Sequence, residues 1–190
     1  MTKNQKHIVI GITGASGSIY AKSLIENLIA LGPENNIKIE IILSDTAIKV
    51  CKFELGENYI VNLPLKTYSN DDYFASFASG SSVADAFVVV PCTMGTLGRI
   101  AHGTSDNLIC RTADVVLKER KQLILVTRET PLNIIHIKNM ELVTLAGGII
   151  LPASPSFYLN PQTIEELVGT VTNRIIDLLN LKIVVKRWGE

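Results

Sequence analysis

Short apolar runs alternate with segments of helical periodicity along the whole chain. The runs predict strands at His7–Thr13, Lys38–Leu43, Ala86–Pro91, Gln122–Thr127 and Gly148–Leu151, and a weaker strand near Tyr59–Leu63. Helical patterns follow at Ser18–Leu31, Ser44–Phe53, Gly95–Ala101, Ser105–Lys118, Pro131–Ala146 and Pro161–Leu179. Strands that alternate with helices indicate a parallel sheet covered on both faces. We therefore expect an α/β fold with a doubly wound, mainly parallel sheet, in a single domain that covers residues 1–190.

The last predicted helix has the clearest start signals. Asn160 is a good N-cap, Pro161 suits the first turn, and Glu165 and Glu166 follow where a helix start favours negative charge. Arg174 lies at the edge of the apolar stripe of this helix rather than opposite it. Its side chain is therefore expected to point into a cleft or across an interface.

The segment Lys66–Ser82 breaks the alternation. It is rich in Ser, Asp and Gly, yet it contains Tyr73, Phe74 and Phe77. A plain solvated loop does not need three aromatic side chains, so a substrate lid or a subunit-contact loop competes here with an ordinary covered loop.

Composition narrows the class of protein. Hydrophobic residues make up 47% of the chain and charged residues only 19%, below the usual ~25%, so we expect an oligomer. Lys+Arg and Asp+Glu are equal at 18 each, with no basic run, which argues against nucleic acid as a partner. The polar N-terminus lacks a signal-peptide core, and the densest apolar stretch, Ala86–Cys92, is too short to span a bilayer. Three widely spaced cysteines favour a reducing, cytoplasmic setting, and the three histidines form no metal-ligand pair.

A glycine-rich turn directly follows the first predicted strand. The residues Thr13-Gly14-Ala15-Ser16-Gly17-Ser18 follow the apolar run and open a helix, an arrangement that can hold a phosphate on backbone N–H groups. The glycine spacing is G-x-x-G-x-x-G, unlike that of most dinucleotide sites. The second strand ends at Ser44, where NAD sites usually carry an acid, although Asp45 next to it keeps NAD possible. FMN is the better fit; a tight turn that binds no ligand is the alternative.

Two further segments lie at the carboxyl ends of predicted strands, where open α/β sheets bind ligands. Thr93-Met94-Gly95-Thr96 offers backbone and hydroxyl groups to a ring or a ribityl chain, or else simply caps a helix. Arg128-Glu129 follows the next strand. Near an anion, Arg128 is placed to clamp it. If apolar surfaces cover Glu129, the pKa of its carboxyl is expected to rise, which suits it to proton transfer.

One charged helix face completes the candidates. Arg111, Asp114 and Lys118 share a face of the helix that follows Ser105, because they are spaced by three and four residues. Such a triplet is usually a solvated, self-paired surface. Phe157-Tyr158 lies just before the last helix and offers an aromatic hydroxyl.

Taken in order, these segments resemble the flavin prenyltransferases of the UbiX type. The resemblance covers nearly the whole chain and rests on Thr13-Gly14-Ala15-Ser16-Gly17, Ala78-Ser79-Gly80-Ser81, the run from Ala113 to Arg120, Arg128-Glu129-Thr130-Pro131, Phe157-Tyr158 with Pro161-Gln162, and Arg187-Trp188. It implies a Rossmann-like flavoprotein domain, a homododecamer with active sites between subunits, and a link to ubiquinone biosynthesis. It also implies a reaction in which dimethylallyl monophosphate alkylates reduced FMN at N5 and C6. The prenylated FMN then passes to a UbiD-type decarboxylase.

The resemblance also implies roles for individual residues. FMN contacts are implied for Gly14, Ala15, Ser16, Ser44, Thr93, Met94, Gly95, Thr96 and Arg128. Tyr158 and Arg174 are expected to contact the prenyl phosphate, and Arg111 matches a substrate-binding position. Lys118 and Glu129 are expected to assist departure of the phosphate, with Ser16 near the flavin N5.

Two other functions remain open at this point. An FMN-dependent cysteine decarboxylase of related fold needs a catalytic histidine after the first strands, and no histidine lies between His7 and His102. A flavin carrier needs the glycine-rich turn but not Lys118, Glu129 and Arg174 together. The chain also departs from the resembled family at Tyr73, where relatives often have Trp.

Overall fold

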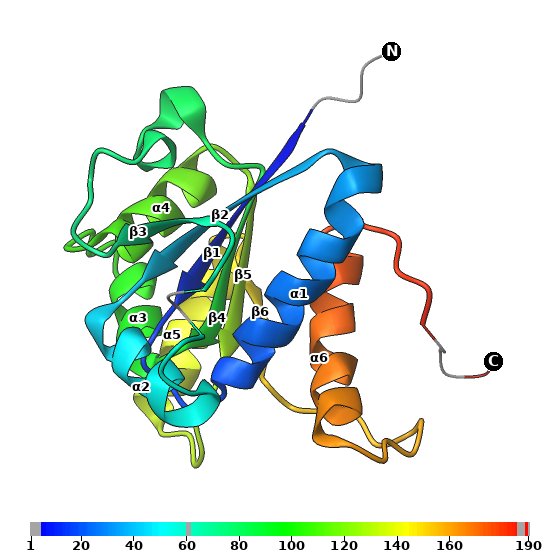
Figure 1. Cartoon of the computed structure of the whole chain (residues 1–190). Coiled ribbons are helices and arrows are strands. Elements are labelled where there is room, and N and C mark those ends of the chain that lie inside the picture. Colours follow the sequence, from blue (N-terminus) through cyan, green and yellow to red (C-terminus); the bar gives the residue numbers. More distant parts are fainter. Residues whose placement is uncertain (1–4, 60–61, 186–188, 190) are drawn as a thin grey trace.

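A six-stranded, entirely parallel sheet forms the centre of the molecule (Figure 1). The computed structural model describes residues 5–59, 62–185 and 189. The sheet order is β3-β2-β1-β4-β5-β6. The strands are β1 (Lys6–Ile12), β2 (Ile37–Leu43), β3 (Lys66–Ser69), β4 (Ala86–Cys92), β5 (Gln122–Thr127) and β6 (Ile149–Ile150). The doubly wound α/β fold expected from the sequence is confirmed.

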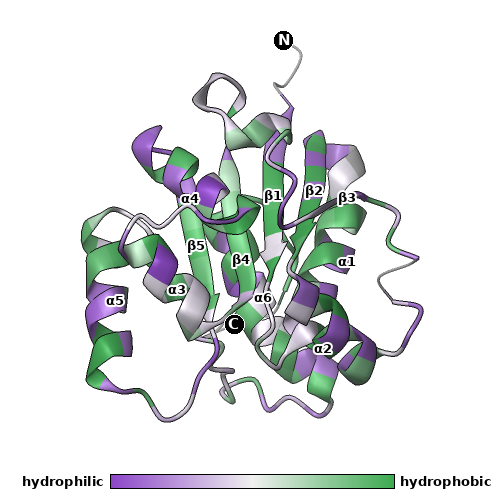
Figure 2. Cartoon of the chain, turned by 90° about the vertical axis from the view of Figure 1, so that its left-hand side faces the viewer, coloured by the Kyte–Doolittle hydropathy of each residue, from purple (hydrophilic) through white to green (hydrophobic). Residues whose placement is uncertain are grey.

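Helices cover both faces of this sheet. The first face carries α1 (Ser18–Asn35), α2 (Asp45–Leu55) and α6 (Ile164–Leu178), and the second carries α3 (Met94–Ala101), α4 (Leu108–Lys118), α5 (Ile134–Leu145) and the short 3-10 helices η1 (Ser76–Ala78) and η2 (Gly80–Ser82). Alternate residues of one strand enter the two cores, as Ile8 and Val9 of β1 do. Figure 2 shows the central strands as the most continuously hydrophobic part of the fold.

Two predictions about secondary structure are wrong: one strand and the start of the last helix. The weaker strand expected near Tyr59–Leu63 is not formed by its described residues, which lie in a turn and an irregular segment; residues 60–61 lie outside the described part of the chain. The edge strand is β3 instead, where only Tyr68 is buried. Helix α6 begins at Ile164 with Thr163 as its N-cap, because Asn160 has a left-handed φ of 52° and Pro161 precedes the helix.

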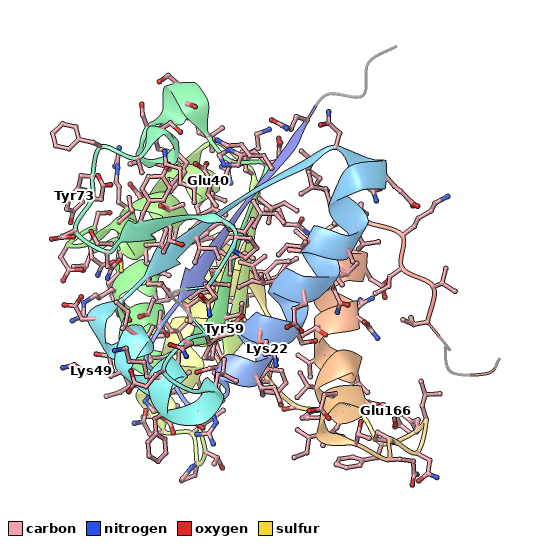
Figure 3. The ribbon with its side chains drawn as sticks, in the orientation of Figure 1. Lys22, Glu40, Lys49, Tyr59, Tyr73 and Glu166 are labelled. Carbon is pink, nitrogen blue, oxygen red and sulfur yellow. The ribbon has the colours of Figure 1, made fainter. Side chains whose placement is uncertain are left out.

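The aromatic loop divides into a buried part and an exposed part. Phe77 is completely buried and contacts the ring of Tyr68 edge-on, so it is a core residue. Tyr73 and Phe74 are 46% and 101% exposed, and Figure 3 places Tyr73 at the outer edge of the molecule. The covered-loop reading therefore holds for Phe77, whereas Tyr73 and Phe74 are available for a contact with another surface.

A buried carboxylate connects the three strands at the β3 edge. Glu40 of β2 accepts a hydrogen bond of 2.7 Å from the Tyr68 hydroxyl, forms a hydrogen bond of 2.6 Å with His7 Nε2, and forms an ion pair with Lys38 at 2.8 Å. Figure 3 shows Glu40 within the sheet, toward the amino ends of the strands. These bonds satisfy a charge that is only 2% exposed.

The parallel strands place their carboxyl ends at one edge of the sheet, which is called here the carboxyl rim. The rim consists of the connections that leave β1, β2, β4 and β5, and it includes residues 13–17, 44–46, 92–96 and 128–133. In Figure 1 the strands run downward, so the rim is at the bottom and the α4–β5 turn is at the top.

Three properties of the described residues bear on the type of protein. Cys51, Cys92 and Cys110 are free, buried thiols. Across residues 5–59, 62–185 and 189, no helix has the length and apolar character needed to cross a membrane. The same residues contain no cluster of three His, Cys, Asp or Glu side chains that could hold a metal ion. Arg187-Trp188 lies outside the described part of the chain.

Candidate functional site

The hydroxyl of Thr13 connects the glycine-rich turn to the segment that follows β4. Thr13 Oγ1 donates to the carbonyl of Pro91 at 2.7 Å and accepts from the N–H of Thr93 at 2.9 Å. The N–H of Arg128 donates to the carbonyl of Cys92 at 3.2 Å. The glycine-rich turn, the Thr93 segment and Arg128 therefore lie side by side at the carboxyl rim, as the sequence predicts.

Two of the predicted ligand hydroxyls cap helices. Ser44 Oγ accepts from the N–H of Ala47 at 3.1 Å at the start of α2, and Thr93 Oγ1 accepts from the N–H of Thr96 at 3.2 Å at the start of α3. The Thr93 side chain therefore caps α3, and the backbone of this segment and the Thr96 hydroxyl, which accepts from Thr93 Oγ1 at 3.0 Å, are the groups left to face a ligand.

The glycine-rich turn offers backbone donors to a ligand. Within the described residues, the N–H groups of Gly14 and Ala15 have no hydrogen-bond partner, and both residues are only half-buried. A Cβ on Gly14 would lie 2.3 Å from Cγ2 of Thr46, so glycine is required for the close packing of α2 on this turn. Free donors, nearby hydroxyls and Arg128 together fit the oxygens and ring edge of FMN.

Glu54, near the end of α2, is a site residue that the sequence reasoning missed. Its carboxylate accepts hydrogen bonds from the N–H of Gly17 at 3.0 Å and of Ser18 at 2.7 Å. These are the donors at the start of α1 that were expected to face an anionic ligand. A protein carboxylate therefore holds the α1 N-terminus, and a ligand phosphate is directed to the neighbouring donors on the rim.

Glu54 also predicts a dependence of stability on pH. Partial burial raises the pKa of its carboxyl, but hydrogen bonds from the Ser16 hydroxyl and from the N–H groups of Ser18 and Gly17 together outweigh burial and lower the pKa. For a lowered folded pKa, the stabilisation is present above the unfolded pKa of ~4.3 and is lost as the pH falls through the folded value.

We expect Glu54→Gln to lower the free energy of unfolding by about 1 kcal/mol at pH 7, since the side chain is exposed and partly screened. Thermal unfolding of both proteins from pH 7 to pH 3 measures this difference. The gap between the two melting temperatures should close at the acidic end. A gap that stays constant across the range would show that the charge of Glu54 contributes nothing.

Arg128 and Glu129 lie at the end of β5 and are both exposed. Burial raises the pKa of the Tyr20 hydroxyl on α1, and the positive charge of Arg128 partly offsets that rise, which places Arg128 beside α1. Glu129 Oε1 accepts from the N–H of Thr130 at 3.0 Å. The described part of the chain leaves Glu129 exposed and does not supply the apolar cover expected over it.

Tyr158 and Arg174 line the same cavity. The cavity measures about 730 Å³ and lies between α6, the segment before it, and Val185. Glu166 and Asp177 also line it. Among the described residues of this lining one arginine stands beside two acids, so further cations are needed to hold a phosphate dianion there.

Lys118 and Arg111 lie on α4, away from the carboxyl rim. Helix α4 runs antiparallel to β5, so Lys118 precedes the start of β5 and Glu129 follows its end. The six residues of β5 separate these two ends by about 20 Å at ~3.3 Å per residue. A single chain therefore brings together Gly14, Ala15, Ser16, Ser44, Thr93, Met94, Gly95, Thr96, Arg128 and Glu129 around the rim, but not Lys118 or Arg111.

Comparison with known proteins agrees with this geometry. The flavoprotein family model matches residues 1–176. The chain is 43% identical to the flavin prenyltransferase UbiX of Methanocaldococcus jannaschii over 185 residues, which are 96% of this chain and 98% of that protein.

Solved structures give the same result. The crystal structure of AnUbiX (PadA1) in complex with FMN and dimethylallyl pyrophosphate superposes with a TM-score of 0.84 at 36% identity, covering 97% of this chain and 100% of that one. A dodecameric FMN-dependent UbiX-like decarboxylase from Escherichia coli O157:H7 superposes with a TM-score of 0.86 at 32% identity and the same coverage. This chain therefore belongs to the UbiX-type flavin prenyltransferases of the flavoprotein family.

Proposed function

We propose that this protein is a flavin prenyltransferase that transfers a dimethylallyl group from dimethylallyl monophosphate to reduced FMN. The observation that carries the proposal is the rim itself, where free backbone donors of Gly14 and Ala15 lie beside Arg128 and Glu129. The full-length likeness to UbiX-type relatives supports the same reaction. When bound, reduced FMN supplies the nucleophilic N5 and C6 positions.

The protein groups then divide the work of donor activation. The backbone of Gly14–Ser16, the segment Thr93–Thr96 and Ser44 hold FMN at the rim. Tyr158 and Arg174 bind the prenyl phosphate, because they line one cavity. A monophosphate is a poor leaving group, so its oxygen must be protonated and its charge neutralised as the C–O bond breaks. Glu129 supplies the proton, and Arg128, Arg174 and Lys118 neutralise the charge.

We propose further that each active site is shared between subunits of a homo-oligomer, with a homododecamer as the expected form. Lys118 and Glu129 cannot meet within one chain, and in the described lining of the cavity at Tyr158 the single cation Arg174 lies beside two acids, Glu166 and Asp177. Helix α5 leaves Ile134, Ile135 and Leu145 between 65% and 79% exposed, and Figure 2 shows hydrophobic positions along this outer helix. Burial of such side chains favours association. A dodecameric relative supports this assembly.

A partner and a compartment complete the proposal. The prenylated FMN is released to a UbiD-type decarboxylase, because a modified cofactor must be used by another enzyme. Three buried free thiols support a reducing, cytoplasmic setting.

We expect the purified protein to bind FMN and not NAD. Strand β2 ends at Leu43, and the Ser44 that follows it caps α2, so the position where NAD sites usually carry an acid holds a hydroxyl. Equilibrium dialysis against each nucleotide measures both affinities. NAD binding without FMN binding would contradict the proposal.

A turnover assay then distinguishes a prenyltransferase from a flavin carrier and from a cysteine decarboxylase. Reduced FMN with dimethylallyl monophosphate, analysed by mass spectrometry under anaerobic conditions, should give prenylated FMN. A parallel assay with the diphosphate donor establishes which of the two is used. A flavin carrier gives no product with either donor, and a cysteine decarboxylase acts instead on a peptide thiol.

A further inference from the structure

The turn at Ala78-Ser79-Gly80-Ser81 has no role in the site described so far, yet it contacts both cationic side chains of α4, Arg111 and Lys118. Arg111 Nε donates to the carbonyl of Ala78 at 3.0 Å. A Cβ on Gly80 would lie 2.7 Å from Lys118 Nζ and 2.5 Å from Glu119 Oε1. The turn therefore lies directly against the Lys118 ammonium group, and the absence of a side chain on Gly80 leaves the space that this group and Glu119 occupy.

Lys118 and Glu119 form an ion pair at 2.5 Å. Neighbouring residues on a helix normally point in different directions. Here the two side chains meet beside Gly80, where Glu119 is the C-cap of α4 with φ −85° and ψ 6°. The Lys118 ammonium group is held over Gly80.

Helix stability does not account for Glu119. A carboxylate at the C-terminal end of a helix is unfavourable beside the negative end of the helix dipole. The two side chains are 48% and 38% exposed, and such surface pairs contribute little to folding. Since Glu119 is costly where it stands, its contact with Lys118 points to a role in directing that ammonium group.

We propose that Glu119 is a positioning residue for Lys118, with Gly80 providing the space in which the pair is held. This inference rests on the proposed function, in which Lys118 binds the donor phosphate at a neighbouring subunit's rim. The Glu119 carboxylate accepts from the ammonium and leaves its other N–H groups to the phosphate. The long lysine side chain then loses less conformational freedom when the donor binds.

The test uses the oligomer loaded with oxidised FMN, which lacks the reduced FMN that the donor alkylates, so that donor binding is measured without turnover. Calorimetry with dimethylallyl monophosphate should show a dissociation constant raised roughly 10-fold in Glu119→Gln, because a misplaced contact weakens binding. Gly80→Ala should give a similar loss, since its Cβ displaces both flexible chain ends while a φ outside the left-handed region leaves the backbone unstrained. FMN affinity and oligomer size should stay unchanged in both.

A double-mutant cycle shows whether Glu119 acts through Lys118. Adding Glu119→Gln to Lys118→Ala should cause no further loss, because the group to be positioned is gone. Glu57→Gln is the matched control: it alters the exposed ion pair of Glu57 with Lys52, at 3.1 Å, and should bind the donor like the wild type.

The outcomes separate this inference from the function on which it rests. Wild-type protein that fails to bind the donor overturns the proposed function and this inference with it. Normal donor binding by wild type and by Glu119→Gln overturns the inference alone. Fully additive losses in the double variant also overturn it, because they show that Glu119 acts independently of Lys118.

Discussion

Glu129→Gln is expected to bind FMN normally and to lose turnover by roughly 10²–10⁴-fold, the usual range for a positioned general acid. The amide keeps the shape of the side chain, and it can still accept from the N–H of Thr130, as the carboxylate does at 3.0 Å. It cannot supply a proton to the departing phosphate. Anaerobic assays with reduced FMN and dimethylallyl monophosphate, followed by mass spectrometry, measure the rate.

Arg174→Ala is the informative comparison for this variant. Arg174 lines the cavity with Tyr158, so its removal should raise KM for the donor more than it lowers kcat, because it takes away a charge-assisted contact. Wild-type rates in Glu129→Gln would show that this carboxyl is structural and that electrostatic help from the cations suffices for phosphate departure.

Lys118→Ala and Glu129→Gln should each be nearly inactive alone and recover activity when the two chains are mixed in one oligomer. The physical reason is the separation of these residues along β5, which places them at opposite ends of one chain. A shared site takes Lys118 from one subunit and Glu129 from another. Random mixing of equal amounts therefore restores up to roughly one site in four.

Two controls make the mixing experiment decisive. An oligomer made only of chains that carry both substitutions, taken through the same mixing procedure, should stay inactive. Light scattering must show that the mixture has the same mass as the wild-type oligomer. No recovery in properly mixed oligomers, or an active monomer, would refute the shared site and leave each chain with a complete site of its own.

The residues of the carboxyl rim could be predicted from the sequence, because each of them directly follows a recognisable strand. Thr13–Ser18, Ser44, Thr93 and Arg128 each follow an apolar run, and the ends of parallel strands meet at one edge. The strand at Lys66–Ser69 was missed for the opposite reason. It is a short edge strand with one buried side chain, and the more apolar stretch before it drew the prediction.

The contacts of Glu54 and Glu119 could not be predicted from the sequence, because tertiary packing determines their partners. Glu54 reaches across from α2 to the start of α1, and Glu119 turns back over Gly80. The sequence nevertheless carries a signal for both. Each is a carboxylate at the C-terminal end of a helix, where the helix dipole disfavours it. A residue that is unfavourable for its own helix is worth examining for a partner elsewhere.

The two edge strands of the sheet are too short to support aggregation between sheets of different molecules. β3 has four residues and β6 has two, so each edge presents few unpaired backbone groups for a strand of another molecule to extend. Lys66, which is 68% exposed, adds a charge at the β3 edge. Short and charged edges protect against amyloid-like stacking of sheets. Copies of this chain can thus be packed at high local concentration through helices and loops while ordered aggregation between sheets stays suppressed.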